Sequence, residues 1–195
     1  MKNWLNRWGH KRLNTETPVS RERKGQGLHV NSRLGLLVPA ADAAQRKQLK
    51  DLVAGLEAIE GLDWQLVADT GLTRRAHAKA RAQRIQKLGD GQDIPADFPQ
   101  LSRVHCFWRD DCGALGLPTE VPAFVDAVDV LITLDAKSTE LPLKAMMRRS
   151  RAPFKVGPVQ EEEDTLDFML TWPEEGDMLS FFQLAFHYLK TLDLK

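Results

Sequence analysis

The fold is decided by the stretch LGLLVPAADAAQRKQLKDLVAGLEAIEGLDWQLVA, residues 34–68. It begins with a short continuous apolar run at 34–38, which is typical of a strand buried on both faces of a sheet. Residues 64–68 form a second apolar run of strand length. Between them, a helix is indicated by apolar residues at helical spacing, namely Leu49, Leu52, Val53, Leu56 and Ile59. A strand, helix and strand of this length match a right-handed parallel crossover.

The same alternation continues to residue 192. Further strands are expected at 104–108, 128–134, 154–156 and 166–172, and further helices at 73–88, 121–128, 140–150 and 177–192. Strands that alternate with helices favour an α/β fold. We therefore expect a Rossmann-like three-layer domain with a mainly parallel sheet over residues 34–195, preceded by a basic amphipathic N-terminal arm at 1–33.

The expected arm consists of a short basic helix and a polar linker. In the helix, Trp4, Leu5 and Trp8 are predicted to share one face with Leu13 near it, and Gly9 weakens the helix. Residues 14–32 are polar and contain Pro18 and two glycines, which is typical of a linker.

Charge is balanced over the 195 residues but not along them. The chain has 27 basic and 27 acidic side chains, so its formal net charge is zero. Residues 1–33 nevertheless have a net charge of +6, residues 73–89 of +6, and residues 160–195 of −7. This asymmetry bears on partners and association rather than on fold.

Several classes of protein are disfavoured by the sequence. No apolar run approaches the roughly 18–20 residues that span a bilayer, and the N-terminus lacks the apolar core of a secretory signal. Two cysteines, Cys106 and Cys112, are too few for a disulfide framework. No glycine-rich phosphate-binding motif follows a strand. His105 and Cys106 point to opposite faces of a strand, so a zinc site with Cys112 is disfavoured, and no metal or cofactor is expected.

The basic segments are the strongest functional signal. The helix at 73–88 contains few large apolar residues, so it is expected to be solvated or bound to a partner. Together with the arm, it would suit RNA, an anionic membrane surface or a protein partner, and the alternative is attraction to the chain's own acidic tail. The candidate binding residues are Trp4, Arg7, Trp8, Lys11, Arg12, Arg74, Arg75, Lys79, Arg81, Arg84 and Lys87.

Residues 128–157, VDVLITLDAKSTELPLKAMMRRSRAPFKVG, carry a resemblance. The stretch resembles an uncharacterised family common in Bacteroidota, with the pattern D-x-L-I-N-L-D … P-L … A-x-F-K-V-G. Asn of that pattern is replaced by Thr133. The resemblance implies a basic N-terminus, a compact α/β domain and a bacterial cytoplasmic protein. The tryptophans and cations of the N-terminal helix leave peripheral attachment to the inner membrane as an alternative. The matching residues are Asp129, Leu131, Ile132, Leu134, Asp135, Pro142, Leu143, Phe154, Lys155, Val156 and Gly157.

The same stretch is more distantly similar to the acceptor-side half of heptosyltransferase-type glycosyltransferases, in which a strand also ends in Asp. Ligands of open α/β sheets bind at the carboxyl ends of the strands, so a pocket is expected near Asp110, Asp135, Lys137 and Lys155. Capping of the helix at 140–150 by Asp135, Ser138 and Thr139 is the favoured alternative. The sequence predicts a non-catalytic binding or interaction protein that uses its basic surfaces, with a glycosyltransferase-like or small-anion-binding domain as the alternative.

Overall fold

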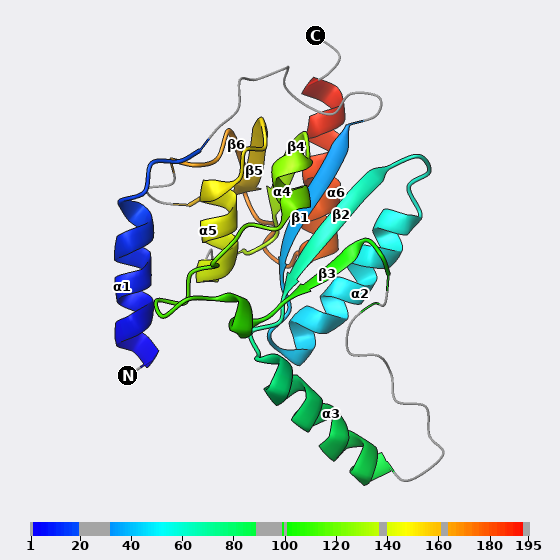
Figure 1. Ribbon diagram of the computed structural model, residues 1–195. Helices are drawn as coiled ribbons and strands as arrows, with labels where there is room; N and C mark the ends of the chain where they lie inside the picture. Colours follow the sequence, from blue (N-terminus) through cyan, green and yellow to red (C-terminus); the bar gives the residue numbers. More distant parts are fainter. Residues whose placement is uncertain are drawn as a thin grey trace.

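The computed structural model describes residues 2–19, 32–88, 99, 101–136, 140–160 and 164–192, with only the backbone described for 2–6 and 84–88. In this part of the chain, six strands form one sheet in the order β3-β2-β1-β4-β5-β6, and every neighbouring pair is parallel (Figure 1). The expected α/β fold with a parallel sheet is confirmed. The strands are β1 Arg33–Pro39, β2 Asp63–Asp69, β3 Val104–Phe107, β4 Val130–Thr133, β5 Phe154–Pro158 and β6 Phe168–Leu170.

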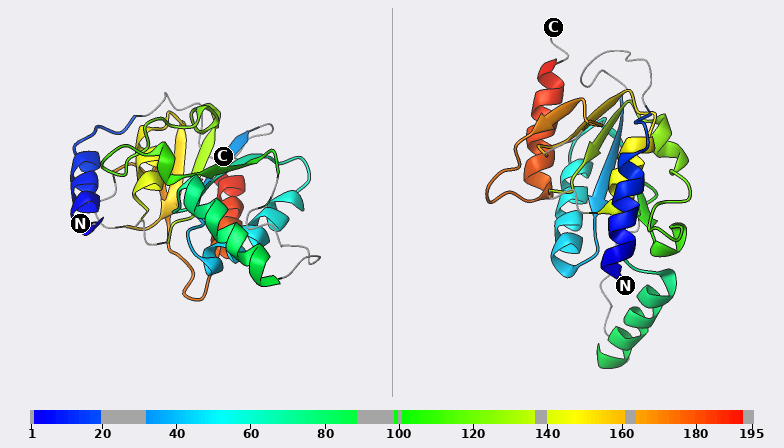
Figure 2. Two further views of the ribbon diagram at one scale, coloured as in Figure 1. Left: turned by 60° about the horizontal axis from the view of Figure 1, so that its bottom comes forward. Right: turned by 90° about the vertical axis from the view of Figure 1, so that its left-hand side faces the viewer.

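Helices cover both faces of the sheet (Figures 1 and 2). On one face, side chains of α2 and α6 pack with alternate residues of the strands around the buried Trp64, Phe181 and Phe182. On the other face, α4 and α5 pack around Leu131 and Met146. The helices are α1 Lys2–Asn14, α2 Ala43–Glu57, α3 Arg74–Leu88, α4 Ala123–Ala127, α5 Leu141–Arg149 and α6 Met178–Leu192, and a 3-10 turn, η1, lies at Arg109–Asp111.

Strands β1 and β4 are the two middle strands of the sheet, and β1 pairs with β2 on one side and β4 on the other. Its residues from 34 to 39 are buried, which agrees with the continuous apolar run of the sequence. Helix α2 begins directly after it with a capping box, in which the Asp42 carboxylate accepts from the Gln45 backbone N–H. The sheet changes direction of winding between β1 and β4, which is where ligands of this architecture bind.

Helix α1 packs on the outer side of α5 (Figures 1 and 2). Leu13 is fully buried in a small cluster with Leu117, Leu141 and Ala145. One turn earlier, a Cβ on Gly9 would lie 2.5 Å from both the Leu115 carbonyl oxygen and Leu141 Cδ2. Gly9 therefore does more than weaken the helix, because its missing side chain permits this close approach.

The prediction that Trp8 and Leu13 lie near one another on the apolar face of the N-terminal helix is wrong. Leu13 is buried, whereas Trp8 is 48% exposed. The contact with the domain runs along positions 9 and 13, which are four residues apart on one side of the helix. Trp8 precedes this line by one residue, which rotates its side chain about 100° away from the contact.

Among the described residues, no helix is long and apolar enough to cross a membrane.

Candidate functional site

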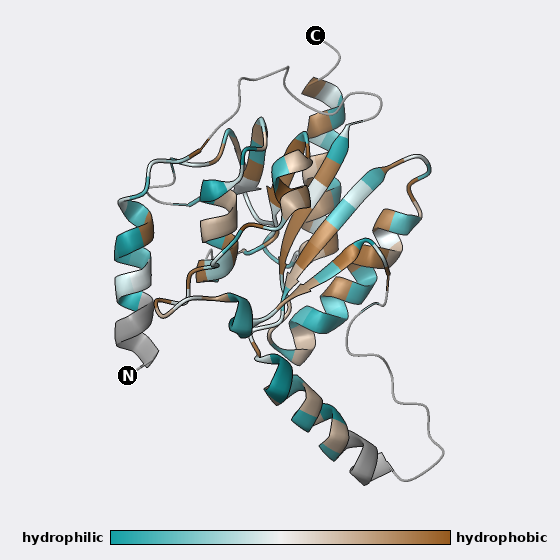
Figure 3. Ribbon diagram, viewed as in Figure 1, coloured by the Kyte–Doolittle hydropathy of each residue, from teal (hydrophilic) through white to brown (hydrophobic). Residues whose placement is uncertain are grey.

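Helix α3 projects from the carboxyl end of the sheet and packs against little of the domain (Figures 1 and 2). Between 74 and 83, all of its side chains are exposed except that of His77, which is half-buried. Figure 3 shows the described part of this helix as hydrophilic, apart from its alanines. The exposed cations are Arg74, Arg75, Lys79 and Arg81. Arg84 and Lys87 also belong to α3, but only their backbone is described.

Polar contacts hold the first turn of α3 to the domain. The backbone N–H of Arg74 donates to Asp110 Oδ2 at 2.6 Å, and its guanidinium donates to both carboxylate oxygens of Asp111. The His77 ring lies 5.0 Å from the Trp108 ring, centroid to centroid. Thr73 caps the helix by accepting from the Ala76 N–H. The helix is thus anchored at one end only, and the rest of its described length is presented to solvent.

A buried carboxylate lies beneath this anchor, at the end of β2. Asp69 is 1% exposed, and its Oδ1 accepts from the Gly71 N–H. Its Oδ2 has no hydrogen-bond partner among the described residues but lies 3.4 Å from an Arg109 nitrogen, which also donates to Glu140. Burial raises the pKa of Asp69 to about 6, and the neighbouring Arg109 opposes this shift.

Helix α1 presents a second exposed basic surface. Arg7, Trp8, Lys11 and Arg12 are all exposed on the side away from α5. The Lys11 ammonium lies 5.7 Å from the centre of the Trp8 ring, within the range of a cation–π contact. Trp4 precedes Trp8 by about one helical turn, but its side chain is outside the described ones.

The two arginines of α5 make their contacts within the molecule. Arg148 is 5% exposed, and its guanidinium binds both carboxylate oxygens of Asp164 and the backbone oxygen of Glu16. Arg149 binds both carboxylate oxygens of Glu16, at 2.7 and 2.8 Å. This ion pair lowers the pKa of Glu16, mainly through the hydrogen bond from Arg149. These arginines therefore fasten the segment after α1 rather than extend a basic surface.

The residues expected to line one pocket are Asp110, Asp135, Lys137 and Lys155, and the three that the structure describes make separate contacts. Asp110 lies at the start of α3, while Asp135 Oδ2 accepts from the Glu140 N–H, the capping contact that the sequence favoured. The Lys155 side chain is almost fully buried and donates to the Val19 carbonyl at 2.7 Å. Lys155 is thus engaged with the N-terminal segment, and its place in a binding pocket stays a prediction. Lys137 lies outside the described residues.

A cavity of about 190 Å³ does lie at the carboxyl edge, and among the described residues that line it Asp135 alone is acidic or basic. The helix N-termini at this edge are occupied by carboxylates of the chain itself. Asp42, Asp110, Asp135 and Asp177 each accept a backbone N–H at or beside the start of α2, α3, α5 and α6, respectively. A helix N-terminus that already holds a carboxylate disfavours a phosphate at the same place.

Metal and thiol chemistry gain no support from the described residues. No group of three or more His, Cys, Asp and Glu side chains is arranged there to hold a metal ion. Cys106 and Cys112 are free thiols, and burial raises the pKa of both. A raised pKa disfavours the thiolate, which is the nucleophilic form.

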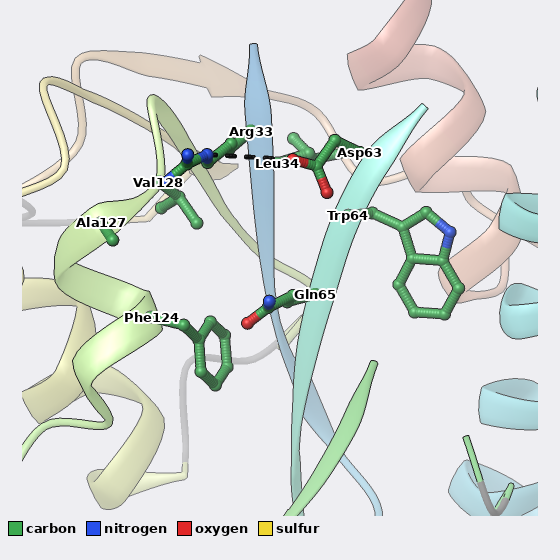
Figure 4. A pocket seen from close by; sticks show the side chains of 8 residues that line it. All are labelled: Arg33, Leu34, Asp63, Trp64, Gln65, Phe124, Ala127 and Val128. Atoms are coloured by element: carbon green, nitrogen blue, oxygen red, sulfur yellow. Dashed lines mark ion pairs between the residues drawn. The ribbon is translucent and has the colours of Figure 1, made fainter. Parts of the chain in front are cut away.

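A second cavity, of about 220 Å³, opens at the amino edge of the sheet between β1, β2 and α4 (Figure 4). The side-chain amide of Gln65 and the ring of Phe124 line this cavity. Arg33 and Asp63 lie at its rim. The sequence analysis missed this site. The signal that could have found it is Gln65, a polar residue within an otherwise apolar strand.

In a comparison with known proteins, part of the chain matches the model of one family. Residues 96–192 match a family described as "Family of unknown function (DUF6913)". The match covers about the C-terminal half of the chain and includes the 128–157 stretch that carries the resemblance. No curated protein and no solved structure matches the chain. The similarity to an uncharacterised family is therefore supported, and it brings no activity with it.

Proposed function

We propose that this protein is a non-catalytic nucleic-acid-binding protein in which α3 makes the phosphate contacts. The observation that carries the proposal is a projecting helix with exposed Arg75, Lys79 and Arg81 and no acidic residue along its whole length. Clustered Lys and Arg side chains neutralise phosphates and displace their counterions. Anchoring by Asp110 and Asp111 holds the helix in place before any partner arrives.

Two other classes of partner fit α3 less well. A helix that lies in a membrane interface needs a broad apolar face, and a helix that docks in a protein groove needs apolar anchors at helical spacing. The side chains at 76, 78, 80 and 82 are alanines, and His77, whose ring lies against Trp108, is the one aromatic side chain described on α3. In the sequence of the helix, Ile85 and Leu88 are the large aliphatic residues, too few for a broad apolar face. Phosphate recognition requires no such face, since charge supplies most of the affinity.

The exposed face of α1 is the second surface in this proposal. Arg7, Lys11 and Arg12 supply cations, and Trp8 supplies an aromatic ring on which an unpaired base can stack. The bacterial origin, the cytoplasmic location and the Bacteroidota relationship belong to the same proposal. A glycosyltransferase-like role for Asp135 is less well supported, because its carboxylate caps α5 and the neighbouring helix N-termini also hold carboxylates.

The test measures binding of a 30-nucleotide RNA and a 30-base-pair DNA duplex by fluorescence anisotropy at several salt concentrations. The triple variant Arg75→Ala, Lys79→Ala, Arg81→Ala should bind both probes more weakly. For duplex DNA, the plot of log affinity against log salt should become shallower by about 0.9 for each phosphate that the variant no longer neutralises. Arg74 is left in place because it anchors the helix.

The matched control is Lys47→Ala, Lys50→Ala, Lys190→Ala, which removes three exposed cations from α2 and α6. It should leave affinity and salt slope near those of the wild-type protein. Equal losses in both triple variants would show that only net charge matters and would contradict a site on α3. Binding to anionic vesicles that exceeds binding to either nucleic acid would overturn the proposal in favour of a membrane surface.

A further inference from the structure

The cavity at the amino edge of the sheet has the features of a small-molecule site that is separate from α3. Its volume is about 220 Å³, whereas an apolar cavity of about 150 Å³ is already sufficient to bind benzene. Its apolar wall is built by Leu34, Phe124, Ala127 and Val128. The cavity therefore has room for one aromatic ring system.

The side-chain amide of Gln65 determines which polar group a ligand of this cavity needs. In Figure 4 this side chain extends from β2 toward Phe124, while Trp64 points to the opposite face of the sheet. Gln65 Oε1 is buried and has no hydrogen-bond partner among the described residues. A buried carbonyl oxygen without a donor is costly, so the cavity favours an occupant that presents an N–H or O–H group.

The aromatic wall is already fixed in position. The Phe124 ring stacks on the His105 ring of β3, with centroids 4.5 Å apart and an interplanar angle of 28°. A ring held in this way needs little ordering when a planar molecule packs against it, which lowers the entropic cost of binding.

The rim of the cavity is charged and open to solvent. Arg33 Nε lies 3.9 Å from Asp63 Oδ2, and the two side chains are 64% and 56% exposed. The backbone beneath is fixed, because the Arg33 N–H donates to Asp129 Oδ2 at 2.8 Å. The entrance can therefore change through side-chain movement while the walls stay in place.

We propose that this cavity binds a small planar aromatic or heteroaromatic molecule that carries an N–H or O–H donor. The donor bonds to Gln65 Oε1, and the ring packs against Phe124 and Val128. The proposal does not depend on nucleic-acid binding, since the cavity is lined by residues at the starts of β1 and β2, whereas α3 follows the end of β2.

The experiment titrates indole and 1-methylindole, which differ by the N–H donor, into ¹⁵N-labelled protein and follows both by NMR. Indole should shift the side-chain amide signals of Gln65 and bind about tenfold more tightly than 1-methylindole, as expected for one hydrogen bond to a buried acceptor. An intermolecular nuclear Overhauser effect between indole and the Phe124 ring should place the ligand in the wild-type protein.

Two variants complete the test. Gln65→Leu should remove the preference for indole, and Gln48→Leu, which alters the lining of the carboxyl-edge cavity, should keep it. Equal affinities of wild-type protein for the two indoles would overturn the proposal. Failure of both to bind at millimolar concentration would do the same. Because the Overhauser measurement uses wild-type protein, misfolding of Gln65→Leu would not obscure the result.

Discussion

Helices α1 and α3 are both basic, but the domain holds them in different ways. Helix α1 is attached along its side, where Gly9 and Leu13 contact α5 and its neighbouring loop. Helix α3 is attached at its first turn by Asp110, Asp111 and the Trp108 ring. Side attachment buries apolar area and stabilises the whole domain, whereas end attachment fixes a direction and leaves the rest of the helix exposed.

This difference shows that a positive segment charge does not by itself define a binding surface. On α1, one side carries the contact with the domain and the other carries Arg7, Lys11 and Arg12. Deleting residues 1–33 would therefore expose Leu117 and Leu141 as well as remove cations. Substitutions on the exposed faces separate the two effects, and deletion does not.

The largest effect is expected for Leu13→Ala. Truncating a fully buried leucine costs about 2–5 kcal/mol, so urea denaturation should show a loss of this size in the free energy of unfolding. On α3, Ala80→Leu should change the same quantity by less than about 0.5 kcal/mol, because that side chain is exposed. If Leu13→Ala is as mild as Ala80→Leu, α1 is not side-attached in solution and the contrast with α3 fails.

The next effect concerns the carboxylate below α3. The pKa of Asp69 is raised from 3.8 to about 6 in the folded protein. Its contribution to stability is therefore complete below pH 3.8 and is lost as pH rises through about 6. Asp69→Asn removes this loss. The free energy of unfolding of the variant should therefore rise relative to that of the wild type between pH 4 and 7, by up to roughly 3 kcal/mol.

Urea denaturation of both proteins at pH 4, 5, 6 and 7 measures this difference directly. Arg109 keeps Glu140 as a partner in the variant, so its guanidinium is not left unpaired. A difference that stays constant with pH would contradict the raised pKa. A fall in variant stability toward pH 7 would mean that the Asp69 charge is itself an anchor of α3.

The smallest effect is local to α3. Asp110→Ala removes the carboxylate that accepts the Arg74 N–H, and the loss of such a cap costs about 1 kcal/mol. Backbone amides of α3 should then exchange with solvent about fivefold faster, as native-state hydrogen exchange can measure. Asp51→Ala, an exposed substitution on α2, should leave α3 exchange unchanged. Equal protection of α3 in both variants would show that Asp110 does not anchor it.

Much of the fold could be predicted from the sequence. The apolar run before Pro39, the helical spacing from Leu49 to Leu56 and the alternation that follows each predict the element that the structure contains. These signals are local, because burial on one or both faces of an element leaves a period in its own sequence. The exposure of α3 was predictable for the same reason, since the helix has few large apolar residues.

The remaining contacts could not be predicted because their partners are distant in the sequence. Arg148, Arg149 and Lys155 resemble surface cations, yet each has an acceptor on Glu16 or Val19, more than 130 residues earlier. Gly9 resembles a helix breaker until Leu115 and Leu141 lie against it. A single sequence contains no local period that links such pairs.

The hydrogen bonds that join Glu16 and Val19 to α5 and β5 also constrain the order of folding. Chains are synthesised from the N-terminus, and contacts across more than 130 residues can form only after both partners have been made. Helix α1 is translated before α5 and β5 but can dock only when both have left the ribosome. Until then, Leu13 of the nascent chain has no partner to cover it. A chain truncated before residue 148 also lacks Arg148 and Arg149, the two arginines that bind Glu16.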